Sequence, residues 1–144
     1  MTRSNRLPVI ADMQAVTHRI FSDPRGSLVP VEVAAAVPFP VERLFWVFGV
    51  PEGHLRGGHA HRLCAQYLLC VSGALDVSAD DGLASATFRL EAGSGLLIPP
   101  AIWASERYLT ADTTLLVLCS HSYDVDDYID AKDDLRAFRA VQGR

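Results

Sequence analysis

Short apolar segments, rich in Val, Leu, Ile and Phe, follow one another along most of the chain. Gly, Pro and Asp interrupt them at a spacing of roughly 8–12 residues, which is typical of β-strands joined by tight turns in sandwiches and barrels. The pattern therefore predicts an all-β domain. The predicted strands cover residues 16–21, 27–32, 43–50, 64–72, 73–78, 84–90, 94–98, 103–108 and 114–120.

Turn and helix signals complete this picture. The dipeptide Asp81-Gly82 fits a β-hairpin turn, because both residues tolerate positive φ. Near the C-terminus, residues 133–141 predict a short helix with Leu135 and Phe138 on one face. The chain has no internal repeat, low-complexity tract or linker that would separate two domains. We therefore expect a single domain over residues 1–144, with a core of about residues 14–130.

The composition is that of an ordinary globular protein, with 49% hydrophobic and 21% charged residues among 144. A chain of this length can bury a sizeable core without a metal or a disulfide. Its formal net charge of −4 disfavours binding to nucleic acid or to anionic membrane surfaces. No apolar run approaches the roughly 18 residues of a membrane helix, and the start of the chain lacks the pattern of a secretory signal. We therefore expect a cytoplasmic protein.

The cysteines are an odd set, Cys64, Cys70 and Cys119, without CxxC spacing. Each lies in or beside an apolar run, and free cysteine is among the most buried residue types. We expect three buried free thiols.

The chemistry is concentrated in the stretch around His59 and His61. Residues two apart in a strand point to the same face of the sheet, so both imidazoles should project together. Such a pair serves as a metal site or as an acid/base site, or is simply exposed. Arg56 and Arg62 flank the pair and surround two titratable rings with cations, which argues against the third interpretation.

The spacing of this stretch resembles the first motif of the cupin superfamily, G-x5-H-x-H-x4-E-x6-G. The matching residues are Gly53, His59, His61 and Gly73, with Gln66 in place of the glutamate. The second cupin motif has partial counterparts in Gly93 and Pro99, but Ala101 and Ala104 replace its Gly and its metal-binding His. The resemblance implies a jelly-roll β-barrel, also called a double-stranded β-helix. An amide and a methyl group are poor substitutes for metal ligands, so we expect no metal.

The segment Arg56-Gly57-x-His59-Ala60-His61-Arg62 resembles a narrower signature, RG-x-HAH-[KR]. It is that of the nucleotide-sugar 3,4-ketoisomerases, metal-free cupins that act on dTDP-4-keto-6-deoxyglucose. Further similar segments follow in the same order along the chain: Phe21-x-Asp23-x-Arg25-Gly26-x-Leu28 upstream, then Ile98-Pro99-Pro100-x-x-Trp103 and Tyr123-Asp124-x-x-Asp127-Tyr128-Ile129 downstream.

The resemblance implies an isomerase that moves a keto group between C4 and C3 of a dTDP-linked 6-deoxyhexose through an enediol, without a cofactor. His59 would be the principal proton-transfer residue and His61 its partner, and an imidazole with a pKa near 6.5 suits both directions of transfer. The family commonly has tyrosines on the preceding strand, where this chain has Phe45 and Trp46. The family also implies a homodimer that exchanges strands.

Substrate binding makes separate demands on the site. Guanidinium groups suit the two phosphates of a nucleotide sugar, and an aromatic ring can stack on the base or the sugar, although large aromatics on strands are more often core. Gln66 can orient an imidazole by a hydrogen bond. The candidate binding residues are Arg25, Arg43, Arg56, Arg62, Gln66, Trp46 and Trp103.

Two other functions remain open at this point. A non-catalytic cupin could bind a nucleotide sugar as a sensor or scaffold, which the missing tyrosines favour. A metal-dependent cupin enzyme could use His59, His61 and His121 as ligands.

Overall fold

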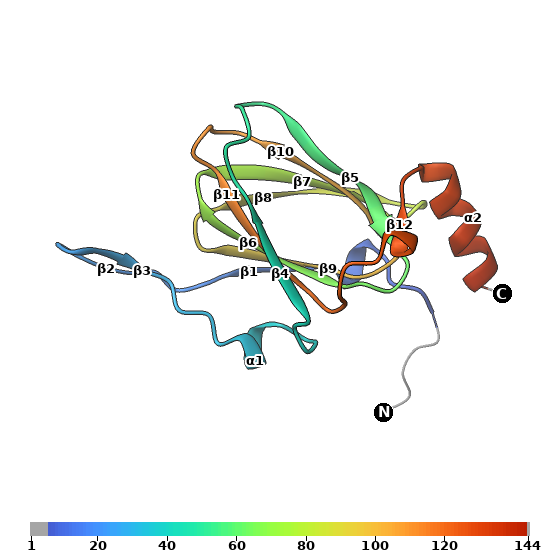
Figure 1. Ribbon diagram of the computed structural model, residues 1–144, viewed down its shortest axis with the longest axis horizontal. Coiled ribbons are helices and arrows are strands. Elements are labelled where there is room, and N and C mark those ends of the chain that lie inside the picture. The colour runs from blue at the N-terminus through green and yellow to red at the C-terminus, as the bar shows by residue number, and fades with distance from the viewer. Residues whose placement is uncertain (1–5, 144) are drawn as a thin grey trace.

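Two five-stranded antiparallel sheets face each other in the computed structural model, which describes residues 6–143 (Figure 1). The first five residues and Arg144 of the predicted domain lie outside the described part. The first sheet has the strand order β1 (Gln14–Thr17), β9 (Ser94–Ile98), β6 (Gln66–Ser72), β11 (Thr114–Cys119) and β4 (Arg43–Val47). The second sheet has the order β12 (Tyr128–Ile129), β5 (Leu55–His61), β10 (Trp103–Tyr108), β7 (Ala74–Asp80) and β8 (Ser85–Glu91).

Shorter elements surround this sandwich. The hairpin of β2 (Phe21–Asp23) and β3 (Gly26–Leu28) extends away from the body of the molecule (Figure 1). The 3-10 helix η1 (Ile10–Asp12) precedes β1, and α1 (Val33–Ala36) precedes β4. At the C-terminal end, η2 (Val125–Asp127) leads into β12, and α2 (Lys132–Gln142) follows.

The core lies between the two sheets and follows the period of two that strands impose. Alternate residues of the central strands, such as Leu68 and Cys70 on β6 or Leu75 and Val77 on β7, are buried in one apolar cluster. A fully buried side chain of this size contributes roughly 1.5–3 kcal/mol of hydrophobic stabilisation. The facing sheets therefore need no metal or disulfide to hold them, and the three cysteines are buried and free, as predicted.

The predicted all-β jelly roll is confirmed, with one refinement. Within residues 6–143, strand pairing does not join the two sheets, so the jelly roll is a sandwich rather than a closed barrel. The predicted helix is also confirmed as α2, with Leu135 buried and Phe138 packed beside it. Neither helix of the described chain has the length and hydrophobicity that a membrane span requires.

Some predicted boundaries are wrong. The strand predicted over 16–21 is divided, because β1 ends at Thr17 and β2 begins at Phe21. The strand predicted over 27–32 ends at Leu28, shortly before Pro30, which has no N–H for a ladder. The strand β5 is absent from the predicted set, because its glycines and polar residues hide the apolar pattern.

The hairpin turn between β7 and β8 is confirmed, but only Gly82 has a positive φ, of 87°. Asp81 is buried instead, and its carboxylate accepts hydrogen bonds from the backbone N–H groups of Ile10, Leu83 and Ala84 at 2.8–2.9 Å. The carboxylate therefore closes the turn and ties η1 to it. Burial opposes the ionised form, but these hydrogen bonds outweigh it and lower the pKa of Asp81.

We expect Asp81→Ala to lower the free energy of unfolding at pH 7 by about 3 kcal/mol, because three backbone donors lose a charged acceptor. Urea denaturation measures this, with the exposed Asp134→Ala on α2 as control, for which we expect a change within about 0.5 kcal/mol. Because folding lowers the pKa of Asp81, its contribution is present above the ordinary pKa of 3.8 and is lost as the pH falls through the folded value. Equal stability of the two variants would contradict this role.

Candidate active site

A β-bulge in β5 brings its polar residues to one face. His59 on β5 pairs with Ala104 on β10, whereas Arg56 pairs with Glu106. The two β5 residues are three positions apart and their partners only two, so β5 contains one extra residue between them. Gly57 and Gly58 form the bulge with φ values of 76° and 78°, which side chains rarely adopt. The extra residue reverses the alternation, so that Arg56 faces the interior together with His59.

The interior face of β5 borders a cavity of about 100 Å³ between the two sheets. Its polar lining consists of Arg56, His59, Gln66, Glu106 and Tyr108. Its apolar lining comes mostly from the first sheet: Phe45, Val47, Leu68, Leu115 and Val117. A larger hollow of about 660 Å³ lies outside the sheets beside α2 and contains neither histidine. The small cavity is therefore the hollow that brings His59 together with other polar side chains between the sheets.

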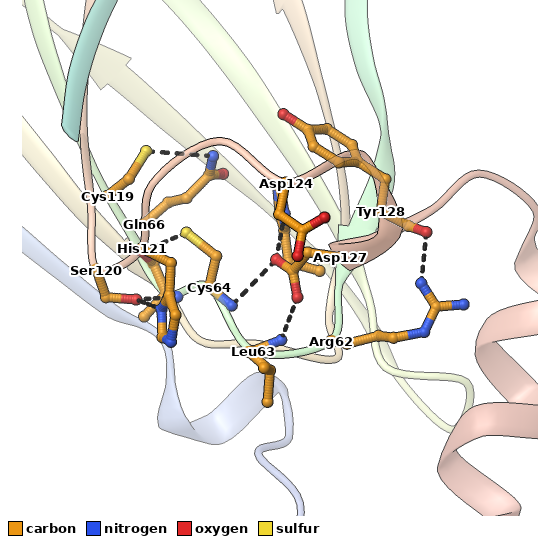
Figure 2. A network of polar contacts seen from close by, with 12 residues as sticks. Arg62, Leu63, Cys64, Gln66, Cys119, Ser120, His121, Asp124, Asp127 and Tyr128 are labelled. Carbon is orange, nitrogen blue, oxygen red and sulfur yellow. Dashed lines mark hydrogen bonds and ion pairs between the residues drawn. The ribbon is translucent and has the colours of Figure 1, made fainter. Parts of the chain in front are cut away.

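Figure 2 shows how the C-terminal segment holds the strand that carries the histidines. The Asp127 carboxylate accepts hydrogen bonds from the backbone N–H groups of Leu63 at 2.7 Å and Cys64 at 3.3 Å. It also lies 3.0 Å from Nδ1 of His61. Because a carboxylate only accepts, His61 carries its proton on Nδ1 and leaves a lone pair on Nε2. That Nε2 is buried and has no hydrogen-bond partner among the described residues.

The two imidazoles and Tyr128 form a compact aromatic group. The ring centroids of His59 and His61 are 5.0 Å apart with the rings nearly perpendicular, at 88°. The ring of Tyr128 lies 4.9 Å from His59 and 4.5 Å from His61. The predicted shared face of the histidine pair is therefore confirmed, and Tyr128 restricts both rings from the C-terminal side.

Burial sets the protonation of both histidines. It lowers the pKa of His59 below the ordinary 6.5, although the Asp130 carboxylate acts in the opposite direction. Burial also lowers the pKa of His61, as does the neighbouring His59, while the hydrogen bond to Asp127 opposes the change. Both imidazoles are therefore neutral near pH 7 and can accept a proton.

The predicted site residues divide into two groups. His59, Arg56 and Gln66 line the cavity, and the Gln66 amide lies 3.9 Å from the Cys119 sulfur (Figure 2). Arg43 is partly buried beside them, with its guanidinium 5.4 Å from the Tyr123 ring and 4.0 Å from the Cys119 sulfur. Burial disfavours its charge, but Tyr128 and Cys119 outweigh this and raise the pKa of Arg43.

The other predicted binding residues lie away from the cavity. Arg62 donates to the backbone oxygens of Asp126 and Tyr128 at 2.7 and 2.6 Å, so it clamps the chain around η2. Trp46 is 59% exposed on the outer face of the first sheet, and Trp103 packs under α2 on the outer face of the second. Arg25 is exposed at the β2–β3 turn and pairs with Asp23.

A metal site at His59, His61 and His121 does not form in the described chain, because His121 is exposed and bonds to Ser120 (Figure 2). The described residues that could hold a metal together are His61, Cys64 and Asp127, whose ligand atoms lie within 4.8 Å of one another. The Asp127 oxygens already accept the bonds described above. This set therefore has a structural explanation in the chain's own hydrogen bonds.

Sequence reasoning missed Asp127, Tyr128 and Glu106 as members of the site. Asp127 and Tyr128 were noticed only as part of a similar segment, since their partner His61 is 66 residues from Asp127 along the chain. Glu106 carried a usable signal, because it lies two residues after Ala104 and so shares its strand face.

Comparisons with known proteins identify the family of this chain. A family model described as FdtA, WxcM-like, C-terminal, matches residues 10–140. The TDP-4-oxo-6-deoxy-alpha-D-glucose-3,4-oxoisomerase of Aneurinibacillus thermoaerophilus is 34% identical over 119 residues, which cover 82% of this chain and 86% of the relative.

Solved structures show the same likeness. The sugar 3,4-ketoisomerase QdtA from Thermoanaerobacterium thermosaccharolyticum, in complex with TDP, has a TM-score of 0.84 at 26% identity, covering 93% of this chain and 98% of QdtA. The TDP-quinovose 3,4-ketoisomerase WlaRB from Campylobacter jejuni has a TM-score of 0.79 at 31% identity, covering 88% of this chain and 98% of WlaRB. Together with the family match, these likenesses show that the chain belongs to the FdtA, WxcM-like family of nucleotide-sugar 3,4-ketoisomerases in the cupin superfamily.

Proposed function

We propose that this protein is an isomerase that moves the keto group between C4 and C3 of a TDP-linked 6-deoxyhexose. The observation that carries the proposal is a neutral imidazole, His59, at a cavity between the sheets, with His61 held behind it by Asp127. The relative from Aneurinibacillus thermoaerophilus is named for this reaction, which supports the choice of sugar. Deoxysugar biosynthesis is the corresponding role.

His59 is the proton-transfer residue in this proposal. A carbonyl moves from C4 to C3 when the C3 proton is removed, an enediol forms and a proton is delivered to C4. The imidazole of His59 lines the cavity and is neutral near pH 7, so it can remove the first proton and return one to the adjacent carbon.

His61 acts on His59 rather than on the sugar, because His61 does not line the cavity. Its ring is fixed on one side by the 3.0 Å contact with Asp127 and on the other by the nearly perpendicular ring of His59. This arrangement keeps the His59 imidazole in one orientation and limits solvent access to its inner side. His61 is therefore a positioning residue.

Arg56 and Arg43 are the candidate binding groups for the diphosphate. Arg56 is exposed and lines the cavity, so its guanidinium lies where the charged part of a nucleotide sugar would enter. Arg43 lies on the side of the Tyr123 and Tyr128 rings. The TDP bound to QdtA supports a nucleoside diphosphate as the handle that this protein recognises.

A homodimer is the expected assembly, and the edge of the first sheet supports it. β4 is the last strand of that sheet, so one of its edges has no neighbouring strand within residues 6–143. Leu44, Trp46 and Phe48 point outward from it and are 54%, 59% and 68% exposed. Such an apolar stripe on an open edge is suited to a second copy of the chain.

The β2–β3 hairpin supports the same assembly. It extends from the sandwich (Figure 1), and its apolar residues Ile20, Phe21 and Leu28 are 47%, 44% and 65% exposed. If these hairpin residues packed on the partner, the apolar residues of the hairpin and the partner's exposed stripe along β4 would both be buried. Arg25 at the hairpin turn would then act on a nucleotide sugar of the partner, not of its own chain.

The three free thiols fit a cytoplasmic location, where thiols stay reduced.

We expect His59→Asn to lower kcat for conversion of TDP-4-keto-6-deoxyglucose to its 3-keto isomer by about 10³-fold, because the proton-transfer group is lost. NMR of the sugar in D₂O measures conversion and deuterium incorporation at the ring carbons. His54→Asn, in the exposed loop before β5, is the matched control and should keep full activity. Binding by the unmodified protein without conversion or exchange would instead show a non-catalytic nucleotide-sugar cupin.

The pH profile should have an acid limb below pH 6.5, because burial lowers the pKa of His59 and the neutral ring is the base. Stability should also fall as the pH drops below this value, since the unfolded histidine binds the proton more readily than the buried one. Because the Asp130 carboxylate raises the pKa of His59, Asp130→Asn should move the acid limb of kcat/KM to lower pH, while Asp134→Asn leaves it in place. A limb that does not move for Asp130→Asn would contradict this assignment.

The dimer can be tested by introducing charge on the exposed stripe. We expect Trp46→Glu to convert a dimer into a monomer in analytical ultracentrifugation, because burial of a carboxylate at the interface is unfavourable. Leu83→Glu is the control, since Leu83 is 90% exposed in the β7–β8 turn. A monomeric unmodified protein, or a Trp46→Glu variant that still dimerises with unchanged affinity, would rule out this interface.

A further inference from the structure

The carboxyl group of Glu106 is the feature of the cavity that the proposed function has not used. Glu106 lies on β10 and lines the same cavity as His59. In the backbone register of β10 and β5, Glu106 lies opposite Arg56. Within the described chain, however, no Lys, Arg or His side chain forms an ion pair with the Glu106 carboxyl group within 4.0 Å. The Glu106 side chain is partly buried, and a carboxyl group in such a place is costly to ionise unless a hydrogen-bond partner, a cation or a ligand compensates it.

The backbone of β5 makes room for this carboxyl group. A Cβ atom at Gly57 would overlap Oε2 of Glu106, so only glycine at this position allows the carboxyl to lie against the strand. The same bulge turns Arg56 inward and places it opposite Glu106. The local chain geometry is therefore matched to a carboxyl group at the cavity, next to the strand that carries His59.

The protonation of Glu106 follows from its surroundings. Burial raises its pKa to about 7, although the Arg56 guanidinium acts in the opposite direction. The other titratable groups that line the cavity are His59 and Tyr108, and burial raises the pKa of the Tyr108 hydroxyl well above its ordinary range. Glu106 is therefore the lining group, besides His59, that can both give and take a proton near neutral pH.

We propose that Glu106 is a second catalytic residue, which carries the hydroxyl proton between O4 and O3 of the sugar while His59 moves the proton between C3 and C4. The inference rests on the isomerase activity proposed above. It assigns a separate group to each of the two proton movements that the reaction needs. It also supplies a hydroxyl-proton carrier in a cavity where Phe45 offers no hydroxyl.

The proton and electron balance closes with these two groups alone. The C3–H bond breaks, its proton passes to His59, and its electron pair forms the C3=C4 bond. The electron pair of the C4 carbonyl takes the proton of the neutral Glu106 carboxyl, which gives the enediol. The Glu106 carboxylate then removes the O3 proton, the C3 carbonyl forms, and the proton on His59 passes to C4. Both residues return to their starting states.

The test separates the two proton movements in Glu106→Gln. The amide can still donate a hydrogen bond to O4 but cannot carry a proton to or from O3, so conversion to the 3-keto sugar should fall by about 100-fold or more. Deuterium incorporation at C3 of the recovered TDP-4-keto-6-deoxyglucose in D₂O should stay within about 10-fold of the unmodified protein. His59→Asn should lose both, and Glu91→Gln, an exposed residue on β8, should lose neither.

Each outcome is decisive. Conversion within threefold of the unmodified protein, or an equal loss of conversion and C3 exchange, would overturn the role of Glu106. An unmodified protein that shows neither conversion nor exchange would remove the proposed isomerase activity itself, and this inference with it. Because the raised pKa of Glu106 makes its ionised form unfavourable in the folded state, Glu106→Gln should unfold at no lower temperature than the unmodified protein at pH 8, which excludes a folding defect.

Discussion

The buried carboxylate of Asp127 is the contact on which the geometry of the histidine pair depends. It accepts from His61 and from two backbone N–H groups just beyond β5, and so joins the C-terminal segment to the strand that carries the histidines. The pairing of β12 with β5 and the clamp formed by Arg62 reinforce this junction. Tyr128 then packs on both imidazoles, because it follows Asp127 directly in the chain. The positions of the two imidazoles are thus fixed by Asp127 and Tyr128, which lie more than 60 residues away along the chain.

The first sheet of the sandwich contributes an apolar wall to the cavity. Phe45, Val47 and the inward residues of β6 and β11 exclude water from one side of the cavity, while β5 and β10 supply the polar groups on the other. Burial disfavours the charged form of a titratable group, which is why it lowers the pKa of His59 and raises that of Glu106. Both shifts favour the neutral forms, an imidazole that can accept a proton and a carboxyl group that can donate one.

The sequence predicted those features that local patterns encode. Alternation and turn residues predicted the all-β fold, and the spacing of His59 and His61 predicted their shared face. Contacts between distant segments were out of reach, as with Asp127, and so was the outward direction of Trp46, because a two-residue period does not say which face is the interior. The bulge was equally hidden, since two adjacent glycines are compatible with a turn, a bulge or a close approach to a ligand.

That bulge divides β5 into two parts with opposite phase. His59 faces the cavity from one side of the bulge and Arg56 from the other, although a regular strand would place residues 56 and 59 on opposite faces. Removing one glycine would restore regular pleating and rotate the upstream half of the strand by about 180° while the histidines stay in place. The part of β5 that carries the proposed proton-transfer residue His59 and the part that carries the proposed anion-binding residue Arg56 thus differ in phase through a single backbone residue, so a change at that residue would alter the binding side of the cavity and leave the histidines in place.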